Sequence, residues 1–195
     1  GDELTESLLK QIEPFGAGMH LGEEVSVVRA EGEGFFLETD GGKQFTAKAV
    51  VIAAGVGSFQ PRALRTKAID EVNEDCIQYR VRNPEQYAGK NLAILGGGDS
   101  ALDWVVELAP IAKHITLVHR RDEYRAVDAT VAAMRAFEAV GKVTTLENAK
   151  VSELQHDGGV LTKMIVGNKS DETFEVDVEQ MLVFFGLAPK LGPIA

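Results

Sequence analysis

The chain has 195 residues, of which 45% are hydrophobic and 26% charged, values typical of a globular protein with an apolar core. Its formal net charge of −10 argues against general nucleic-acid binding, and no apolar run approaches the ~20 residues that cross a bilayer. Cys76 is the only cysteine, so an intrachain disulfide, a CxxC redox pair and a multi-cysteine metal site are excluded. We therefore expect a cytoplasmic protein that binds neither membrane nor nucleic acid.

The first third of the chain predicts a helix followed by strands. Residues 2–13 have leucine and isoleucine at helical spacing, which indicates a short amphipathic helix. Three β-rich segments follow, at 23–31, 34–40 and 43–55. An Asp-Gly-Gly turn at 40–42 favours a hairpin between the last two. The third segment ends in "AVVIAAGVGSFQP", which predicts a buried strand running into a glycine-rich turn that Pro61 closes.

The second half of the chain has the pattern of a nucleotide-binding fold. After an irregular polar stretch at 62–90, "NLAIL", "GGGDSALDWVVELAPIA" and "HITLVHRR" predict a strand, a turn with a helix, and a second strand, the order of a βαβ unit. A helix is predicted at 126–141 with Gly141 as its C-cap, and "KVTTLE" returns to the sheet. The remaining segments predict strands, with a second Asp-Gly-Gly hairpin turn at 157–159.

The glycine-rich turn at 96–101 carries the first functional motif. Gly96, Gly98 and Ala101 fit the pattern GxGxxA between a buried strand and an amphipathic helix. The first glycine permits the tight turn, the second lets a pyrophosphate approach the backbone, and the small third residue allows close packing of helix on strand. The helix N-terminus then offers free N–H groups to the phosphates. The predicted cofactor-binding residues of this turn are Gly96, Gly97, Gly98, Asp99, Ser100 and Ala101.

Two of these residues have a local role as well. The side chains of Asp99 and Ser100 are suited to capping the helix by accepting backbone N–H bonds. We take capping as their main role and contact with the cofactor as a second one.

The segment "HRRDEYR" carries the second motif. In NAD-binding βαβ units, an acidic residue about 20 positions after the glycines binds the ribose 2′-hydroxyl. Here that position has Arg120 and Arg121, with Arg125 close behind, and guanidinium groups match the oxygens of a 2′-phosphate. The motif therefore predicts NADP rather than NAD. The alternative is a solvated turn in which neighbouring carboxylates and water satisfy the arginines. His119 either borders the adenine ribose or is a strand-end histidine.

Together, "GGGDSALDW" and "HRRDEYRA" resemble the thioredoxin-reductase-like flavoproteins, whose NADPH domain has a glycine turn followed by HRRxxxR. The resemblance covers essentially the whole chain, because "VVIAAGVGSFQPR" and "MLVFFGLAPKLGPIA" resemble that family's two crossings between FAD and NADPH domains. Thioredoxin reductases have a CxxC pair before the glycine turn, whereas the corresponding stretch here has Cys76 alone, which we take as structural. The stretch is instead similar to the ferredoxin (flavodoxin)–NADP reductases of this type.

This resemblance implies an α/β fold, a Rossmann-like three-layer NADPH-binding domain with an antiparallel β insertion, flanked by partial FAD-domain β segments. It implies part of an FAD domain at 1–69, the NADPH-binding domain at 70–184 and a return into the FAD domain at 185–195. By the same resemblance, the full-length enzyme is a homodimer that passes a hydride from NADPH to FAD and then electrons to ferredoxin or flavodoxin. The cofactors supply the chemistry, so no side chain is assigned as acid, base or nucleophile, and no metal ligand is assigned.

The resemblance also assigns two residues to FAD. Val25 matches a position whose backbone meets the FAD adenine, and Phe59 matches one near the flavin; packing of strand and turn is the alternative for both. An N-terminal FAD βαβ unit is not found in this sequence. We therefore expect the middle of such an enzyme, which binds NADP but holds FAD weakly and has little reductase activity alone.

Three questions stay open from sequence. The acceptor could be another one, such as a low-molecular-weight disulfide, and a non-catalytic NADP-binding module is the alternative from a different class. A basic face for an acidic ferredoxin or flavodoxin, or else a solvated linker, accounts for Arg62, Arg65, Lys67, Arg80 and Arg82.

Overall fold

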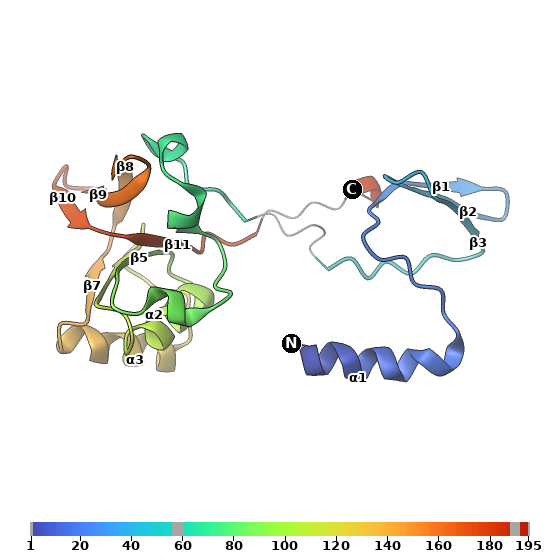
Figure 1. Cartoon of the computed structure of the whole chain (residues 1–195), viewed down its shortest axis with the longest axis horizontal. Coiled ribbons are helices and arrows are strands. Elements are labelled where there is room, and N and C mark those ends of the chain that lie inside the picture. The colour runs from blue at the N-terminus through green and yellow to red at the C-terminus, as the bar shows by residue number, and fades with distance from the viewer. Residues whose placement is uncertain (1, 56–60, 188–191, 195) are drawn as a thin grey trace. The chain divides into compact units, whose positions relative to one another are not determined.

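The computed structural model describes residues 2–55, 61–187 and 192–194, which divide between two compact units. One unit comprises Gly1–Ser58 with Pro189–Ala195, and the other comprises Phe59–Ala188. Each unit has its own secondary structure and its own sheets (Figure 1).

The first unit consists of a helix and a small antiparallel sheet. Its elements are α1 (Asp2–Ile12), the 3₁₀ turn η1 (Glu13–Phe15), β1 (Val25–Glu31), β2 (Gly34–Thr39), β3 (Gln44–Ala47) and the 3₁₀ turn η5 (Gly192–Ile194). The sheet has the order β1-β2-β3, and the Asp-Gly-Gly turn joins β2 to β3 as predicted. The Gly42 amide donates to the Thr39 carbonyl (2.9 Å), and the φ of +78° at Gly42 explains why glycine suits this turn.

The strand predicted at the end of 43–55 is wrong. The ladder ends at Ala47, and residues 48–55 have no strand partner among the described residues. Val51 and Ile52 are 89% and 63% exposed. Their apolar run satisfies the local pattern of a buried strand, but a strand also needs a neighbour with which to pair its backbone. The glycine-rich turn that follows, including Phe59, lies outside the described residues.

The second unit is built on a parallel sheet with the order β4-β11-β5-β6-β7. Its strands are β4 (Ile77–Gln78), β5 (Asn91–Leu95), β6 (His114–Val118), β7 (Val143–Leu146) and β11 (Gln180–Val183). Leu95 pairs with both Val118 and Val183, so the carboxyl ends of the three central strands meet at one edge. After a polar first residue, these strands are buried and, apart from Thr116, apolar, because both faces of the sheet are covered.

Helices cover one face and a second sheet covers the other (Figure 1). The helices are α2 (Asp99–Leu108) and α3 (Asp128–Ala139). The antiparallel sheet has the order β10-β9-β8 and comprises β8 (Ala149–Asp157), β9 (Val160–Asn168) and β10 (Thr173–Asp177). Ile94 packs in the core on the helix side with Leu102, whereas Leu95 packs in the core on the other side with Leu154. This alternation confirms the predicted three-layer α/β domain with an antiparallel insertion.

Most local predictions are confirmed in this unit, but the C-cap of α3 is Val140 rather than Gly141. Gly141 is the next residue, with a φ of +75°, and its amide donates to the Glu138 carbonyl (2.9 Å). The Asp-Gly-Gly turn at 157–159 joins β8 to β9. Cys76 is buried in the core shared with the antiparallel sheet. The irregular stretch before β5 contains the very short β4 and the 3₁₀ turns η2 (Ile69–Glu71), η3 (Glu74–Cys76) and η4 (Pro84–Tyr87).

Within the described ranges, no helix is long and apolar enough to span a bilayer. The same part of the chain contains no group of three or more His, Cys, Asp or Glu side chains that could hold a metal ion.

A substitution at Leu102 tests the packing of the core beneath α2. Its side chain is fully buried, so Leu102→Ala is expected to lower the free energy of unfolding of the second unit by about 2–5 kcal/mol. Trp104, the only tryptophan, lies on the same helix, so its fluorescence in a urea titration reports on this unit. Glu107→Ala, on the exposed side of α2, is the control and should change stability by less than about 0.5 kcal/mol. A small loss at Leu102 would contradict this packing.

Candidate nucleotide site

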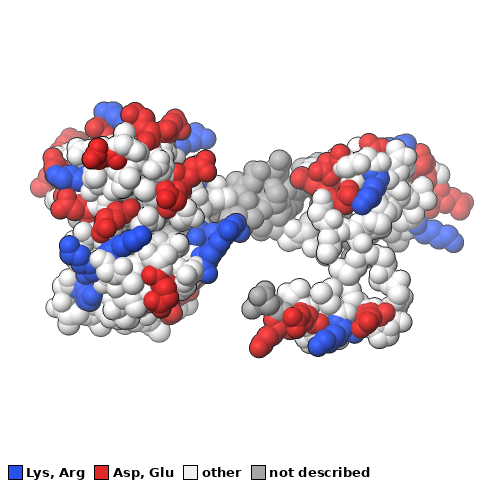
Figure 2. Space-filling view, in the orientation of Figure 1, with Lys and Arg blue, Asp and Glu red and all other residues white. Residues whose placement is uncertain are grey.

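A cleft of about 1060 Å³ lies at the carboxyl edge of the parallel sheet, in the second unit. It is at the upper end of the size of ligand sites, about 300–1,000 Å³. Among its lining residues, Asp99 is the single carboxylate, whereas seven side chains are cationic: Arg62, Arg65, Arg80, Arg120, Arg121, Arg125 and Lys150. Figure 2 shows that Lys and Arg side chains gather in patches on the second unit, between larger acidic areas. In a chain of net charge −10, such a cleft favours a ligand with several negative charges.

The glycine-rich turn forms the floor of the cleft directly after β5. Gly96 has a φ of +149°, and an added Cβ would lie 2.7 Å from the Phe184 carbonyl oxygen and 2.9 Å from the Cβ of Ala101. The turn therefore needs glycine at this position for two reasons, its conformation and the closeness of β11 and α2. Ala101 is 1% exposed, so the small residue of the motif does permit α2 to pack closely on the strand.

The next glycine makes room for a histidine. A Cβ at Gly97 would overlap the imidazole ring of His119, which follows β6 and is 9% exposed. The ring stacks on Tyr124, with centroids 5.3 Å apart, and Nε2 lies 3.0 Å from the Glu123 carbonyl oxygen. Since a carbonyl only accepts, Nε2 carries the proton. Burial, followed by the charges of Arg120 and Arg121, lowers the pKa of His119 against the raising effect of that hydrogen bond. Its position therefore matches a strand-end histidine that also lines the cleft.

The start of α2 is open to a ligand. Gly98 is the N-cap, and a Cβ there would meet no atom within 4 Å, so the backbone is accessible at this point. The first N–H groups of α2 have no partner within the helix and carry the positive end of its dipole. This geometry suits the pyrophosphate of a dinucleotide.

The capping role predicted for Asp99 and Ser100 is wrong. Neither side chain caps α2, because the helix begins at Asp99 itself with Gly98 as its N-cap. Asp99 Oδ1 instead accepts the amide of Val127 (3.0 Å), the residue before α3. The carboxylate therefore ties the start of α2 to the start of α3. The local sequence cannot reveal this, because the two residues are 28 positions apart.

Backbone hydrogen bonds join the "HRRDEYR" loop to the glycine turn. The Arg125 amide donates to the Gly97 carbonyl (2.7 Å), and the Gly96 amide donates to the Val118 carbonyl (3.1 Å). The two predicted motifs therefore form one site. Arg120 and Arg121 line the same cleft as Arg125, and all three are exposed.

These three arginines are free to bind a ligand. None of them forms an ion pair with any residue that the structure describes, the adjacent Asp122 and Glu123 included. Three uncompensated guanidinium groups at one strand end are the arrangement expected for a bound phosphate rather than for a neutralised turn.

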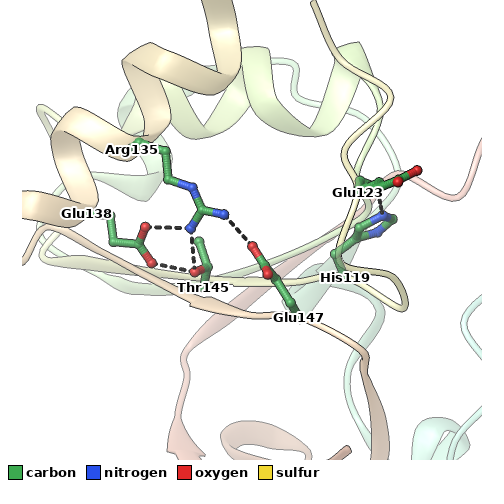
Figure 3. Close-up of polar contacts among 6 residues, drawn as sticks. All are labelled: His119, Glu123, Arg135, Glu138, Thr145 and Glu147. Atoms are coloured by element: carbon green, nitrogen blue, oxygen red, sulfur yellow. Dashed lines mark hydrogen bonds and ion pairs between the residues drawn. The ribbon is translucent and has the colours of Figure 1, made fainter. Parts of the chain in front are cut away.

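A polar network supports this loop from α3 (Figure 3). Arg135 of α3 donates to Glu138 (2.6 Å), to Thr145 at the end of β7 (3.1 Å) and to Glu147 beyond it. Thr145 in turn donates its hydroxyl to Glu138. The Glu138 hydrogen bond, with support from Glu147, raises the pKa of Arg135 despite its partial burial. Burial opposes ionisation of Glu138, but the hydrogen bonds from Thr145 and Arg135 lower its pKa below the usual value.

Tyr124 connects this network to the glycine turn. The Arg135 guanidinium lies 5.5 Å from the centroid of the Tyr124 ring, whose other neighbour is His119. Burial, and then the negative charge of Glu147, raises the pKa of the Tyr124 hydroxyl, so the phenol stays neutral. The column from Arg135 through Tyr124 and His119 to Gly97 fixes the distance between α3 and the glycine turn.

The cleft contains residues that the sequence analysis did not place in it. Lys150 belongs to neither motif but lines this cleft. Arg62, Arg65 and Arg80, for which the sequence leaves a basic face and a solvated linker open, line it as well. Lys67 instead pairs with Glu153 (3.6 Å). The order of the strands would have placed these cationic residues in the cleft. Strands β4, β11 and β8 bring the segments that carry them to the edge of the sheet where β5 and β6 end.

Of the two residues assigned to FAD, only Val25 is described. It lies at the start of β1 in the first unit and is 37% exposed. Phe59 is outside the described residues.

The model of one protein family, described as pyridine nucleotide-disulphide oxidoreductase, matches residues 3–195. The chain belongs to the pyridine nucleotide-disulphide oxidoreductase family. Members named ferredoxin–NADP reductase match the whole chain, at 47% identity in Cupriavidus pinatubonensis and 48% in a Polaromonas species, and the chain covers 53% and 54% of those proteins. It thus spans about half the length of these curated relatives. The resemblance to ferredoxin–NADP reductases inferred from the sequence motifs is confirmed.

Two solved structures confirm the fold. Thioredoxin reductase from Lactococcus lactis matches with a TM-score of 0.84 at 22% identity, over all of this chain and 62% of that one. Bacillithiol disulfide reductase from Staphylococcus aureus matches with a TM-score of 0.79 at 16% identity, over 97% of this chain and 57% of that one. The chain has no CxxC pair, because Cys76 is its only cysteine; its thiol is free and buried.

The contact between Gly97 and His119 is testable by a double-mutant cycle. Gly97→Ala is expected to lower the free energy of unfolding by about 1–3 kcal/mol, because the new methyl group overlaps the imidazole ring. In a His119→Ala background the ring is absent, so the same substitution should have less than half this effect. Gly167→Ala on β9, where an added Cβ meets no atom within 4 Å, is the control. Trp104 fluorescence during urea unfolding measures the free energy of unfolding of the unmodified chain, the two single variants and the double variant. Equal effects of Gly97→Ala in both backgrounds would contradict the contact.

Proposed function

We propose that this chain contains the NADP-binding part of a flavoprotein ferredoxin–NADP reductase. The single observation that carries the proposal is the cationic cleft at the sheet edge, where the free arginines of the loop after β6 meet the glycine turn after β5. The names of the relatives support the choice of reductase and of ferredoxin as the partner.

The residues of the cleft divide between the phosphates of NADP. The pyrophosphate lies against the turn and the start of α2, whose contact residues are Gly96, Gly97, Gly98, Asp99, Ser100 and Ala101. Arg120, Arg121 and Arg125 bind the 2′-phosphate, a dianion that NAD lacks. His119 positions this group of arginines by holding the loop against Gly97.

The protein residues act by binding and orientation. When bound, the nicotinamide and the flavin supply hydride transfer and the subsequent release of single electrons. The cleft orients NADP along the carboxyl ends of the strands, the position at which open parallel sheets bind ligands. The chain offers no dithiol for exchange with a disulfide, and this favours ferredoxin or flavodoxin over a thioredoxin-type acceptor.

The two units correspond to different cofactors in this proposal. The NADP-binding domain, which we place at 70–184, falls within the second unit. The first unit is part of an FAD domain, in which the Val25 backbone meets the adenine and Phe59 lies near the flavin. We propose a homodimer in the cytoplasm for the full-length enzyme. The lone, buried thiol is consistent with that compartment.

The arginines provide the direct test of NADP binding. Replacement of Arg120 and Arg121 by methionine is expected to weaken NADP binding about a hundredfold and NAD binding by less than about threefold, because only NADP presents the 2′-phosphate. Isothermal titration calorimetry of the chain with both nucleotides measures this. Arg82→Met is the matched control, since Arg82 is exposed but does not line the cleft. Equal losses for both nucleotides would show that the arginines serve folding, and an unmodified chain without NADP preference would refute the proposed site.

The reductase itself has a separate test. We expect the 195-residue chain to bind NADP without stoichiometric FAD, and the flavin-containing full-length protein to reduce ferredoxin with NADPH. Absorption spectra of the flavin and of ferredoxin under anaerobic conditions measure both. Tight FAD binding by the short chain would contradict the assignment of the first unit as a partial FAD domain. If NADPH did not reduce the flavin of the full-length protein, the proposed reductase activity would be contradicted.

A further inference from the structure

The turn between β7 and β8 lies against the arginine loop. Asn148 has a φ of +53°, a left-handed conformation that asparagine tolerates, and it reverses the chain directly after β7. Its amide donates to the Arg121 carbonyl (3.2 Å), and the Ala149 amide donates to the His119 carbonyl (3.0 Å). Two backbone bonds therefore hold the start of β8 beside the 2′-phosphate end of the cleft.

Lys150 is the next residue, and its ammonium charge is available. The side chain is exposed and lines the same cleft as the arginines. It forms no ion pair with any residue in the described part of the chain. The nearest carboxylates along the chain are both paired elsewhere, Glu147 with Arg135 and Glu153 with Lys67.

The ion pair of Glu147 affects the electrostatic field beside the arginine loop. Glu147 lies on the segment that contacts the arginine loop, where an unpaired carboxylate would repel a phosphate. Its ion pair with Arg135 turns that charge toward α3 (Figure 3). Lys150 is thus an uncompensated positive charge on the β8 side of the arginine loop.

We propose that Lys150 binds the 2′-phosphate of NADP together with Arg120 and Arg121, and is a specificity-determining residue for NADP over NAD. The inference rests on the proposed function and adds a cation that lies outside both sequence motifs. A lysine ammonium is a compact point charge on a long stem, which complements the planar, forked donors of arginine on the same phosphate. Because it comes from β8 rather than from the 119–125 loop, the phosphate is held by two separate elements.

The test compares Lys150 with a lysine on the neighbouring strand. Lys150→Met keeps the aliphatic stem and removes the charge; it is expected to weaken NADP binding about fivefold and to leave NAD binding within about twofold. Lys150→Arg should retain most of the NADP preference. Lys163→Met is the control, because Lys163 lies on β9, pairs with Glu175 (3.2 Å) and does not line the cleft. Calorimetric titrations with NADP and NAD, each at two salt concentrations, measure the affinities.

Each outcome has one meaning. A selective loss for NADP in Lys150→Met, with a shallower salt dependence than the unmodified chain, supports the inference. An unchanged ratio of NADP to NAD affinity overturns it, and so does an equal loss for both nucleotides. If the ratio collapses in Arg120→Met and Arg121→Met but not in Lys150→Met, the proposed function stands without this residue. If the unmodified chain does not prefer NADP, the proposed function itself fails.

Discussion

The hydrogen bond from the Arg125 amide to the Gly97 carbonyl is the contact on which the candidate site depends. It connects the loop after β6 to the turn after β5, which neighbouring parallel strands bring to the same edge. The His119 ring fills the space that Gly97 leaves, and Tyr124 and Arg135 stack behind it. The backbone position of the arginine loop therefore follows from the packing of the sheet and α3. A phosphate that binds the arginines meets a loop whose backbone is already held in place, so less ordering of the loop is needed on binding.

Charge is distributed unevenly in this acidic chain, and the distribution explains why the cleft stays basic. Arg135 is bound by two carboxylates at the rear of the loop, whereas Arg120, Arg121 and Arg125 have none among the described residues. An opposite arrangement, with the acids beside the cleft, would give the same net charge and no anion site. Composition alone cannot distinguish the two cases.

The sequence predicted the elements with strong local signals and missed those that depend on distant partners. The βαβ unit, the helix at 126–141 and both Asp-Gly-Gly hairpins have periodicity or turn residues that are visible locally. Strand β4 has two residues and forms because β11 pairs with it from about a hundred positions away. The bond between Asp99 and Val127 and the place of Lys150 likewise depend on tertiary contacts. The two motifs were thus predictable as one phosphate site, while its supporting contacts were not.

The segment after β3 has a consequence for handling the protein. Val51 and Ile52 belong to an uncharged run of β-branched and alanine residues that is largely exposed and has no strand partner within the described residues. Such a run can add itself to the open edge of another molecule's sheet. Self-association of this kind would rise with protein concentration, and light scattering measures it. Ile52→Lys would place a charge in this run and discourage that pairing; Ile52 belongs to the first unit, and the residues that line the cleft belong to the second.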